Sequence, residues 1–274
     1  MRGRGLAAVG AGVLFLFAAV GLLAPLLAPH DPRALSGDAL EAPSGRHLLG
    51  TNDIGQDVAS EVIWGARTSL MVAVGASSIA LVVAVLVGVG AALAGGWVDR
   101  AVMRLVDVLL AVPVLPLLVL MAALAGPSRL LVVIIIGCLA WPRMAPVLRS
   151  QTLSLRQRGF VQAAQGLGGG LLWVLRRHLV PALAPLLAAN FVIIAGVAVL
   201  LESGLAFLGL GDPTAPSWGQ VLNRALDHPG IYFTRTWMWW VLPPGIAITA
   251  TIVGFTFLAV GLEPRFNPRW DREQ

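Results

Sequence analysis

Long apolar runs alternate with short charged segments along this chain of 274 residues. An α-helix needs roughly 20 apolar residues to cross a hydrocarbon layer of about 30 Å. Six runs approach that length, and they cover residues 5–28, 68–94, 108–125, 130–148, 181–208 and 236–262. The pattern therefore predicts an all-α integral membrane protein with six transmembrane helices.

Two of these runs need a further argument. The run 5–28 follows two arginines and competes with a cleaved signal peptide, but it is long for one, and Pro29 follows the candidate cleavage site. These features favour a retained anchor. The run 130–148 is interrupted by Arg143 after thirteen uncharged residues. It still crosses the membrane if Arg143 reaches the cytoplasmic surface or faces the helix bundle.

Composition agrees with this class of protein. Hydrophobic residues make up 57% of the sequence and charged residues only 12%, which suits a polytopic membrane protein with one membrane domain. The net charge of +5 would also suit a nucleic-acid-binding protein. However, the arginines lie at the ends of apolar runs, where membrane topology explains them better.

All nineteen basic residues are arginine, and the chain has no lysine. Because a Walker A phosphate loop requires a lysine, the sequence excludes this type of ATP site. Any ATP-driven work must therefore come from another chain. The single cysteine, Cys138, also excludes an intrachain disulfide.

Six spans place both termini on the same side of the membrane. That side, which includes segments 95–107 and 143–180, holds thirteen arginines, whereas the opposite side holds six. Short cytoplasmic loops are enriched in positive residues. The count therefore predicts that both termini and segment 143–180 lie in the cytoplasm.

The longest polar interruption runs from residue 155 to 185 and reads LRQRGFVQAAQGLGGGLLWVLRRHLVPALAP. Glycines at 168–170 break a helix, because glycine costs about 1 kcal/mol relative to alanine in a helix interior. We expect a short helix, a glycine turn and a second helix over 171–178 that enters the membrane at Pro181. Such a hairpin has nothing of its own to pack on, which favours docking onto a partner. The alternative is a basic interfacial loop held near anionic lipid.

The pattern Gln162-Ala163-Ala164-x-x-x-Gly168, followed by Pro181, resembles the E-A-A-x-x-x-G cytoplasmic loop of ABC importer permeases. In that family the loop carries the coupling helix between spans four and five and inserts into a cleft of a separate ATPase subunit. The family's leading Glu is Gln162 here, which keeps hydrogen bonding but excludes a salt bridge. The resemblance implies these ATPase-coupling residues: Arg158, Gln162, Ala163, Ala164, Gly166, Gly168 and Pro181.

A second stretch, HLLGTNDIGQDVASEVIWGARTSL at 47–70, resembles the dipeptide, oligopeptide and nickel branch of these permeases, in its C-type chain. That branch often has Asp at Asn52 and a basic residue at Gln56, so the local charge pattern is altered here. From Ile54 onward, apolar residues with acidic residues between them predict a short amphipathic helix on the membrane surface. Its role is either that of a structural lid or of direct contact with the substrate.

Glu202 is an ionisable residue inside the fifth predicted span, where a charge is usually paired or set against water. It is either a gate or cavity-lining acid, or a structural hydrogen-bonding group against a neighbouring helix.

Asp107 and Pro113 are further candidates for the translocation path, since proline bends a helix and a bent helix can line a cavity. Arg104 is expected to pair with Asp107 across one helical turn. The stretch 207–219 also matches the same permease branch.

Several kinds of site receive no support from the sequence. The four histidines, His30, His47, His178 and His228, are scattered without ligand spacing, which predicts no metal site. There is no zinc-protease motif, no nucleophile elbow and no base-reading module. We therefore expect a transport subunit that is not an enzyme, carries no cofactor and binds no nucleic acid.

The resemblance covers nearly the whole chain and implies the type I ABC importer permease fold. It implies half of a translocation path for dipeptides or oligopeptides in the plasma (inner) membrane of a prokaryote. The implied partners are the lipid bilayer, a second and different permease chain, an external solute-binding protein, and two ABC ATPase subunits that bind ATP and Mg. The alternatives are a permease for nickel or another small solute, or an ATP-independent channel or scaffold.

The expected organisation has three parts. Residues 1–67 form the first span and an external loop, and residues 68–262 form a permease core of five spans. The core contains the cytoplasmic coupling loop, 151–180. Residues 263–274 form a cytoplasmic tail.

Overall fold

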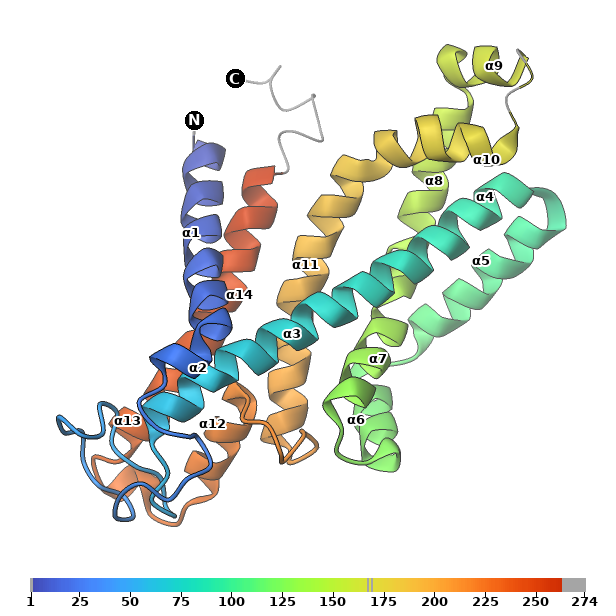
Figure 1. Ribbon diagram of the computed structural model, residues 1–274. Coiled ribbons are helices and arrows are strands. Elements are labelled where there is room, and N and C mark those ends of the chain that lie inside the picture. The colour runs from blue at the N-terminus through green and yellow to red at the C-terminus, as the bar shows by residue number, and fades with distance from the viewer. Residues whose placement is uncertain (1, 167, 169, 263–274) are drawn as a thin grey trace.

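The computed structural model describes residues 2–166, 168 and 170–262, and its regular elements in these ranges are helices (Figure 1). They are α1 (Arg2–Leu22), α2 (Ala24–Leu27), α3 (Val58–Ala84), η1 (Val85–Val89), α4 (Gly90–Ala94), α5 (Gly96–Ala111), α6 (Val114–Ala125), α7 (Arg129–Ala140), η2 (Trp141–Arg143), α8 (Ala145–Arg156), α9 (Gly159–Gly166), α10 (Leu171–Val174), η3 (Leu175–Leu179), α11 (Val180–Phe207), α12 (Trp218–Asp227), η4 (Ile231–Phe233), α13 (Trp237–Trp240) and α14 (Leu242–Leu262). The predicted all-α class is confirmed for this part of the chain. The predicted tail, 263–274, lies outside the described residues.

Four helical stretches are long and apolar enough to cross a membrane unbroken: Gly5–Leu22, Val58–Ala94, Leu175–Phe207 and Trp237–Leu262. Two further stretches qualify as bent pairs. α5 and α6 meet at 85°, and α7 with η2 meets α8 at 48°. By length and composition the described chain therefore has four candidate spans, or up to six if each bent pair crosses the membrane as one span.

Proline explains the sharper of the two breaks. α5 ends at Ala111, and the next two residues, Val112 and Pro113, have extended ψ angles of 129° and 115°. A proline pushes the residue before it out of the α conformation and has no N–H with which to continue the helix. The predicted bend at Pro113 is confirmed, and it divides the apolar run 108–125 between two helices.

The fourth apolar run is also divided, at the position where Arg143 interrupts it. A single 3₁₀ turn, Trp141–Arg143, with Pro142 inside it, separates α7 from α8. Arg143 is exposed on the surface of the isolated chain. The polar interruption in the sequence therefore coincides with a change of helix direction.

The start of α3 differs from the expectation. No separate amphipathic helix begins at Ile54, which is exposed in a turn. Instead Asp57 caps α3, its Oδ2 accepting a hydrogen bond of 2.8 Å from the Ser60 N–H, and the helix runs from Val58 directly into the span. The predicted surface helix is wrong because its acidic residues, Asp57 and Glu61, are buried and bonded to protein groups.

Close contact between small residues holds the spans together. α14 packs along α1, and α3 crosses the molecule in contact with α1, α7 and α11 (Figure 1). At the α1–α14 crossing, a side chain built on Gly10 would begin only 2.5 Å from the carbonyl oxygen of Gly254. Such backbone proximity is typical of helix association inside membranes.

The molecule has two distinct polar ends. The amino end of α1 and the α9–α10 hairpin lie toward one end in Figure 1. The long connection 28–57, with α12 and α13, lies toward the other end. Each end carries one of the candidate functional features described below.

Candidate functional site

The helices α9 and α10 form a hairpin that projects from one end of the molecule (Figure 1). α8 leads into this projecting hairpin (residues 157–179), and η3 leads out of it directly into α11. The predicted short helix and second helix are therefore present. After the second helix the chain stays helical, and it passes the predicted membrane entry, Pro181, as part of α11.

The projecting hairpin presents small and aromatic side chains to solvent. Phe160 and Trp173 are 50% and 52% exposed. Their ring centroids lie 5.9 and 5.1 Å from that of His178, which they flank. The residues predicted to dock a partner are exposed except for the half-buried Ala164: Arg158, Gln162, Ala163, Gly166, Gly168 and Pro181. Exposed aromatic rings beside small residues form a surface that a partner can cover.

Gly168 is the position in the hairpin where glycine is needed for its backbone. Its φ is +86°, in the region that side chains other than glycine rarely adopt. Among the described residues, no atom lies within 4 Å of a side chain built there, so space is not the constraint. The expectation that glycine turns the chain between α9 and α10 agrees with the described residues of this turn.

A small apolar core fastens the hairpin to the rest of the molecule. Val161, Val174 and Leu179 are buried together, and Leu93 and Leu155 pack against them. These contacts join both helices of the hairpin to the ends of α4 and α8. The hairpin is therefore held at its base while its outer surface stays open.

Two hydrogen-bonded links reinforce this base. Arg149 on α8 donates from Nε and Nη2 to the two carboxylate oxygens of Asp99 on α5, at 2.5 Å each. Arg156 Nη1 donates to the carbonyl oxygen of Ala92 at 2.6 Å. Paired bonds from arginine to a carboxylate fix geometry as well as supply energy. Sequence reasoning missed Asp99–Arg149, since nothing local relates residues 50 positions apart.

The expected pair of Arg104 and Asp107 is wrong. Both side chains are exposed on α5, and no ion pair joins them in the described structure. Pro113, which with Asp107 was proposed for the translocation path, caps α6 at the 85° break and is exposed. The structure therefore does not bring Asp107 and Pro113 together with Glu202.

Glu202 is buried on α11 and faces α3. Its Oε2 accepts a hydrogen bond of 2.9 Å from Ser69 Oγ on α3 and a longer one of 3.5 Å from the neighbouring Ser203. Of the two interpretations given above, this geometry is that of a hydrogen bond to a neighbouring helix. Among the described residues, the side chain lines a small void of about 10 Å³, and it is not among the residues that line the two larger cavities along α11.

The connection after α11 is an ordered turn. Asp212 Oδ1 accepts hydrogen bonds from the Thr214 N–H at 2.8 Å and the Thr214 hydroxyl at 2.6 Å. Burial alone would raise the pKa of Asp212, but these bonds and nearby Arg129 hold the pKa below its ordinary value. The stretch 207–219 thus has a defined shape that links α11 to α12.

Two large cavities lie along α11. One, of about 640 Å³, is lined by apolar residues of α6, α7 and α11, with Arg143 and Asn190 as its polar members. The other, of about 740 Å³, lies between α8, α11 and α14 and shares Asn190, with Gln151 and Thr256 as further polar members. α11 is thus the element that both cavities have in common, and it is continuous with the projecting hairpin.

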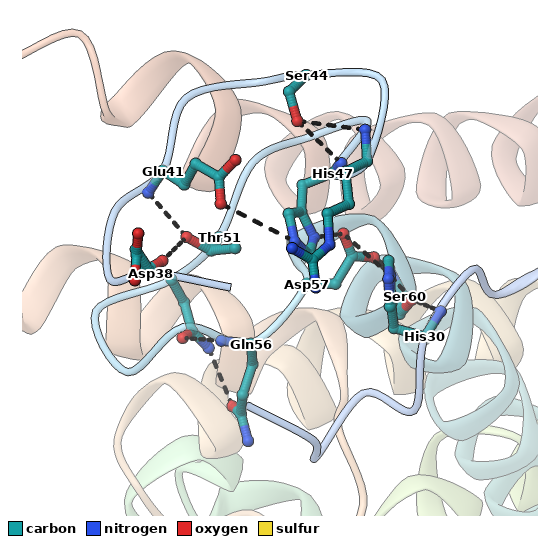
Figure 2. Close-up of polar contacts among 11 residues, drawn as sticks. His30, Asp38, Glu41, Ser44, His47, Thr51, Gln56, Asp57 and Ser60 are labelled. Carbon is teal, nitrogen blue, oxygen red and sulfur yellow. Dashed lines mark hydrogen bonds and ion pairs between the residues drawn. The ribbon is translucent and has the colours of Figure 1, made fainter. Parts of the chain in front are cut away.

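The opposite polar end contains a buried network at the start of α3. Asn52 Nδ2 donates to Gln56 Oε1 at 3.0 Å and to Glu61 Oε2 at 3.2 Å. Arg224, on α12, donates to Gln56 Oε1 at 3.2 Å and to Glu61 Oε1 at 3.1 Å. The network ties the beginning of α3 to α12. Gln56 appears in Figure 2 beside a second cluster that contains His30, His47 and Asp57.

Comparison with known proteins places these features in context. Residues 80–272 match the family described as binding-protein-dependent transport system inner membrane component. A putative peptide permease protein of Brucella suis biovar 1 is 36% identical over 247 residues, covering 89% of this chain and 81% of that protein. The dipeptide transport system permease protein DppC of Alkalihalophilus pseudofirmus is 32% identical, covering 96% and 86%. The glutathione transport system permease protein GsiD of Pectobacterium atrosepticum is 30% identical, covering 96% and 87%.

Proposed function

This chain belongs to the family of binding-protein-dependent transport system inner membrane components, and from that membership we propose that it moves short peptides inward as a permease subunit of an ATP-driven ABC importer. Peptides are the substrate class named for the relatives from Brucella suis and Alkalihalophilus pseudofirmus. Glutathione, named for the relative from Pectobacterium atrosepticum, is itself a short peptide. The common substrate class is therefore a small, flexible amide chain.

The single observation that carries the coupling part of the proposal is the exposed projecting hairpin. It presents Gln162, Ala163 and Gly168 at its surface, in the pattern of the loop through which such permeases engage their ATPases. The chain has no lysine and hence no Walker A loop, so it relies on partner chains to bind ATP and Mg. In this proposal Arg158, Gly166 and Ala164 complete the docking surface.

The route from the hairpin to the solute path runs through α11. A force applied to α9 or α10 reaches α11 through η3, without a break in helical structure from Leu171 onward. The bonds of Arg149 and Arg156 tie α8 to α5 and α4, and the apolar core at the base of the hairpin ties α4 and α8 to the hairpin, so that these helices move with it. Because α11 lines both large cavities, its displacement changes their openings.

The energetic requirement on this mechanism is specific. ATP binding changes which side of the membrane the cavities face only if the partner ATPases bind the hairpin differently in their two states. A docking surface that bound both states equally would hold the complex together without driving transport. The apolar linings, with few polar groups such as Asn190, would let peptides of varied sequence pass.

We place both termini and the projecting hairpin in the cytoplasm, with each bent helix pair crossing the membrane once, which makes six spans. The excess of thirteen arginines over six on the hairpin side supports this orientation. The chain would then consist of the first span with its external loop (1–67), a core of five spans (68–262) that contains the coupling loop 151–180, and a cytoplasmic tail (263–274). α3 is continuous across the first of these boundaries.

The working assembly in this proposal contains a second permease chain, two ABC ATPase subunits and an external solute-binding protein, in the inner membrane of a prokaryote. The present chain supplies half of the translocation path. The binding protein would deliver the peptide at the end formed by 28–57 and α12, opposite the projecting hairpin.

The test is a bulky substitution in the docking surface, Ala163→Trp, in the complete transporter reconstituted into vesicles with its binding protein. We expect peptide uptake to fall at least about 10-fold, because a 1.4 kcal/mol loss of differential binding is a factor of ten. Peptide-stimulated ATP hydrolysis should fall with it. Both rates are measured in the same vesicles.

The matched control is Ala8→Trp, an exposed alanine on α1, outside both the projecting hairpin and the connection 28–57. It should leave uptake and ATP hydrolysis unchanged. Unaltered coupling in Ala163→Trp, with the ATPase subunits still bound, would contradict the assignment of the hairpin.

A further inference from the structure

His30, His47 and Asp57 converge beside the first turn of α3, although they come from different parts of the connection 28–57 (Figure 2). His30 follows α2, His47 lies in the loop, and Asp57 is the N-cap of α3. One potential ligand atom of each residue lies within 4.8 Å of the other two. His47 and Asp57 are fully buried, and the side chain of His30 is 25% exposed.

The distances suit coordination of one cation. His47 Nδ1 lies 3.0 Å and His30 Nδ1 lies 3.9 Å from the same oxygen, Asp57 Oδ1. Zinc bonds of about 2.0–2.2 Å at a tetrahedral centre separate two ligand atoms by roughly 3.3–3.5 Å. The two observed distances lie on either side of this value. Small rotations of the two imidazoles, whose rings are stacked at 4.8 Å, would equalise them.

The cluster has coordinating capacity that the protein leaves unused. His30 Nδ1 is buried, and no hydrogen-bond partner for it exists among the described residues. A buried polar atom without a partner is costly. Asp57 Oδ2, in contrast, is held by the N–H and the hydroxyl of Ser60 at 2.8 and 2.7 Å. These two hydrogen bonds orient the carboxylate so that its other oxygen, Oδ1, faces the two histidines.

A second carboxylate lies behind His47. Its Nε2 is buried and unpaired within the described part of the chain, and Glu41 Oε2 is 3.9 Å away. When Nδ1 of a histidine ligates a metal, the proton resides on Nε2, and that N–H commonly points at a carboxylate. Glu41 is half-exposed and can move closer, so it fits the role of a positioning residue for His47.

We propose that His30, His47 and Asp57 bind one divalent transition-metal cation, with Zn²⁺ the best match to two imidazoles and one carboxylate. Three protein ligands leave a fourth position for water. His30 also lines a cavity of about 640 Å³, which gives the cation and the water access to the site. The bound cation ties the connection 28–57 to the start of α3.

The site is distinct from the proposed coupling function. It lies at the end of the molecule opposite the projecting hairpin, and its cation would act by stabilising the folded connection. Loss of the cation therefore leaves the docking surface intact. Sequence analysis predicted no metal site, because residues 30, 47 and 57 have none of the short ligand spacings that mark known zinc motifs.

The experiment measures zinc binding by the intact transporter, purified through a tag that contains no histidine and stripped of metal with a chelator. His30→Phe keeps a ring over His47 but removes both nitrogens of residue 30. We expect the wild-type complex to bind one more equivalent of Zn²⁺ per copy of this chain than His30→Phe does, in competition with a chromophoric chelator. We also expect Co²⁺ in the wild-type complex to give the visible absorption of a tetrahedral site, absent in the variant.

Two further variants sharpen the outcome. His228→Phe alters a histidine that packs on Trp240, with ring centroids 5.8 Å apart, and should leave the zinc count and affinity unchanged. Glu41→Gln should weaken zinc binding roughly 10-fold while leaving its stoichiometry intact, as expected for a residue that orients a ligand.

The thermal midpoint of the complex gives an independent readout. Added ZnCl₂ should raise it for the wild type and for His228→Phe but not for His30→Phe, while the metal-free midpoints stay alike. Equal zinc counts in the wild type and His30→Phe, or wild-type binding only at millimolar zinc, would overturn the proposal. Should His30→Phe fail to assemble, unchanged zinc affinity in Glu41→Gln together with no Co²⁺ absorption in the wild type would do so instead.

Discussion

Asn52 and Gln56 form a neutral amide pair beside the ion pair of the buried Glu61 and the partly exposed Arg224. The related permease branch often carries an acidic and a basic residue at the two amide positions. Here one amide donates and the other accepts, so the hydrogen bonds are kept without the charges. The single carboxylate that remains, Glu61, is neutralised by Arg224 from α12.

This network predicts opposite outcomes for single and double substitutions. Asn52→Asp would place a second carboxylate against Glu61 and remove a donor. We expect it to destabilise the complex by about 1–3 kcal/mol, the cost of leaving a buried group unmatched. Adding Gln56→Arg to it should recover most of that loss, because the new charges pair with each other. Thermal unfolding of the purified complex measures both variants.

The control for this pair is Asp53→Asn, an exposed neighbour whose charge change should have little effect. A double variant less stable than Asn52→Asp alone would show that the two positions do not interact as described.

Glu202 gives a second prediction for single residues. Because its carboxylate accepts a hydrogen bond from Ser69, Glu202→Gln should keep an acceptor and leave peptide uptake near the wild-type rate. Glu202→Leu removes the acceptor, and we expect a loss of about 1–3 kcal/mol in stability. Uptake and thermal midpoints are measured on the same preparations. Abolished uptake in Glu202→Gln at unchanged stability would favour the gate interpretation.

At the scale of elements, the association of α1 with α14 depends on glycine, whose lack of a side chain lets the two backbones approach closely. Gly10 faces the backbone of α14, whereas Gly12, two residues later on the same helix, has no atom within 4 Å of a side chain built on it. The two glycines therefore sit in the same apolar helix but in opposite environments. Hydropathy does not distinguish them.

This contrast provides a matched pair of variants. Gly10→Leu should force α1 away from α14 and destabilise the complex by about 1–3 kcal/mol, as overpacked sites do. Gly12→Leu adds the same side chain to a free surface and should be close to neutral. Thermal unfolding compares them, and equal midpoints would mean that the α1–α14 contact contributes little to the folded state.

Element boundaries show where a local pattern is sufficient. The break at Pro113 follows from covalent chemistry within two residues, so the sequence predicted it. The start of α3 was predicted wrongly from the sequence. The alternation of apolar and acidic residues after Ile54 fits an amphipathic surface helix only if Asp57 and Glu61 face water. Their partners, His47 and Arg224, come from other parts of the chain.

At the scale of the whole molecule, the two polar ends should lie on opposite sides of the membrane. Cys138→Ala provides a cysteine-free background, and Gln162→Cys and Asp38→Cys then mark the projecting hairpin and the connection 28–57. We expect a membrane-impermeant maleimide to label position 38 in intact cells and position 162 only after the membrane is opened. Labelling of both positions in intact cells would contradict the proposed orientation.

The sequence by itself determined the class of the protein, its apolar runs and the pattern Gln162-Ala163-Ala164-x-x-x-Gly168. These follow from local quantities, since each segment's transfer into lipid, each proline and each glycine acts within a few neighbouring residues. The absence of lysine excluded a phosphate loop in the same direct way.

Only the tertiary structure decided which distant side chains meet. Arg149 reaches Asp99, Ser69 reaches Glu202, and His30 reaches Asp57 across separations that no local periodicity encodes. Each contact depends on helix crossing angles and on the path of a long connection, which are set by packing of the whole chain. For the same reason, the candidate cation site could be identified only in the folded chain, where its three distant residues lie close together.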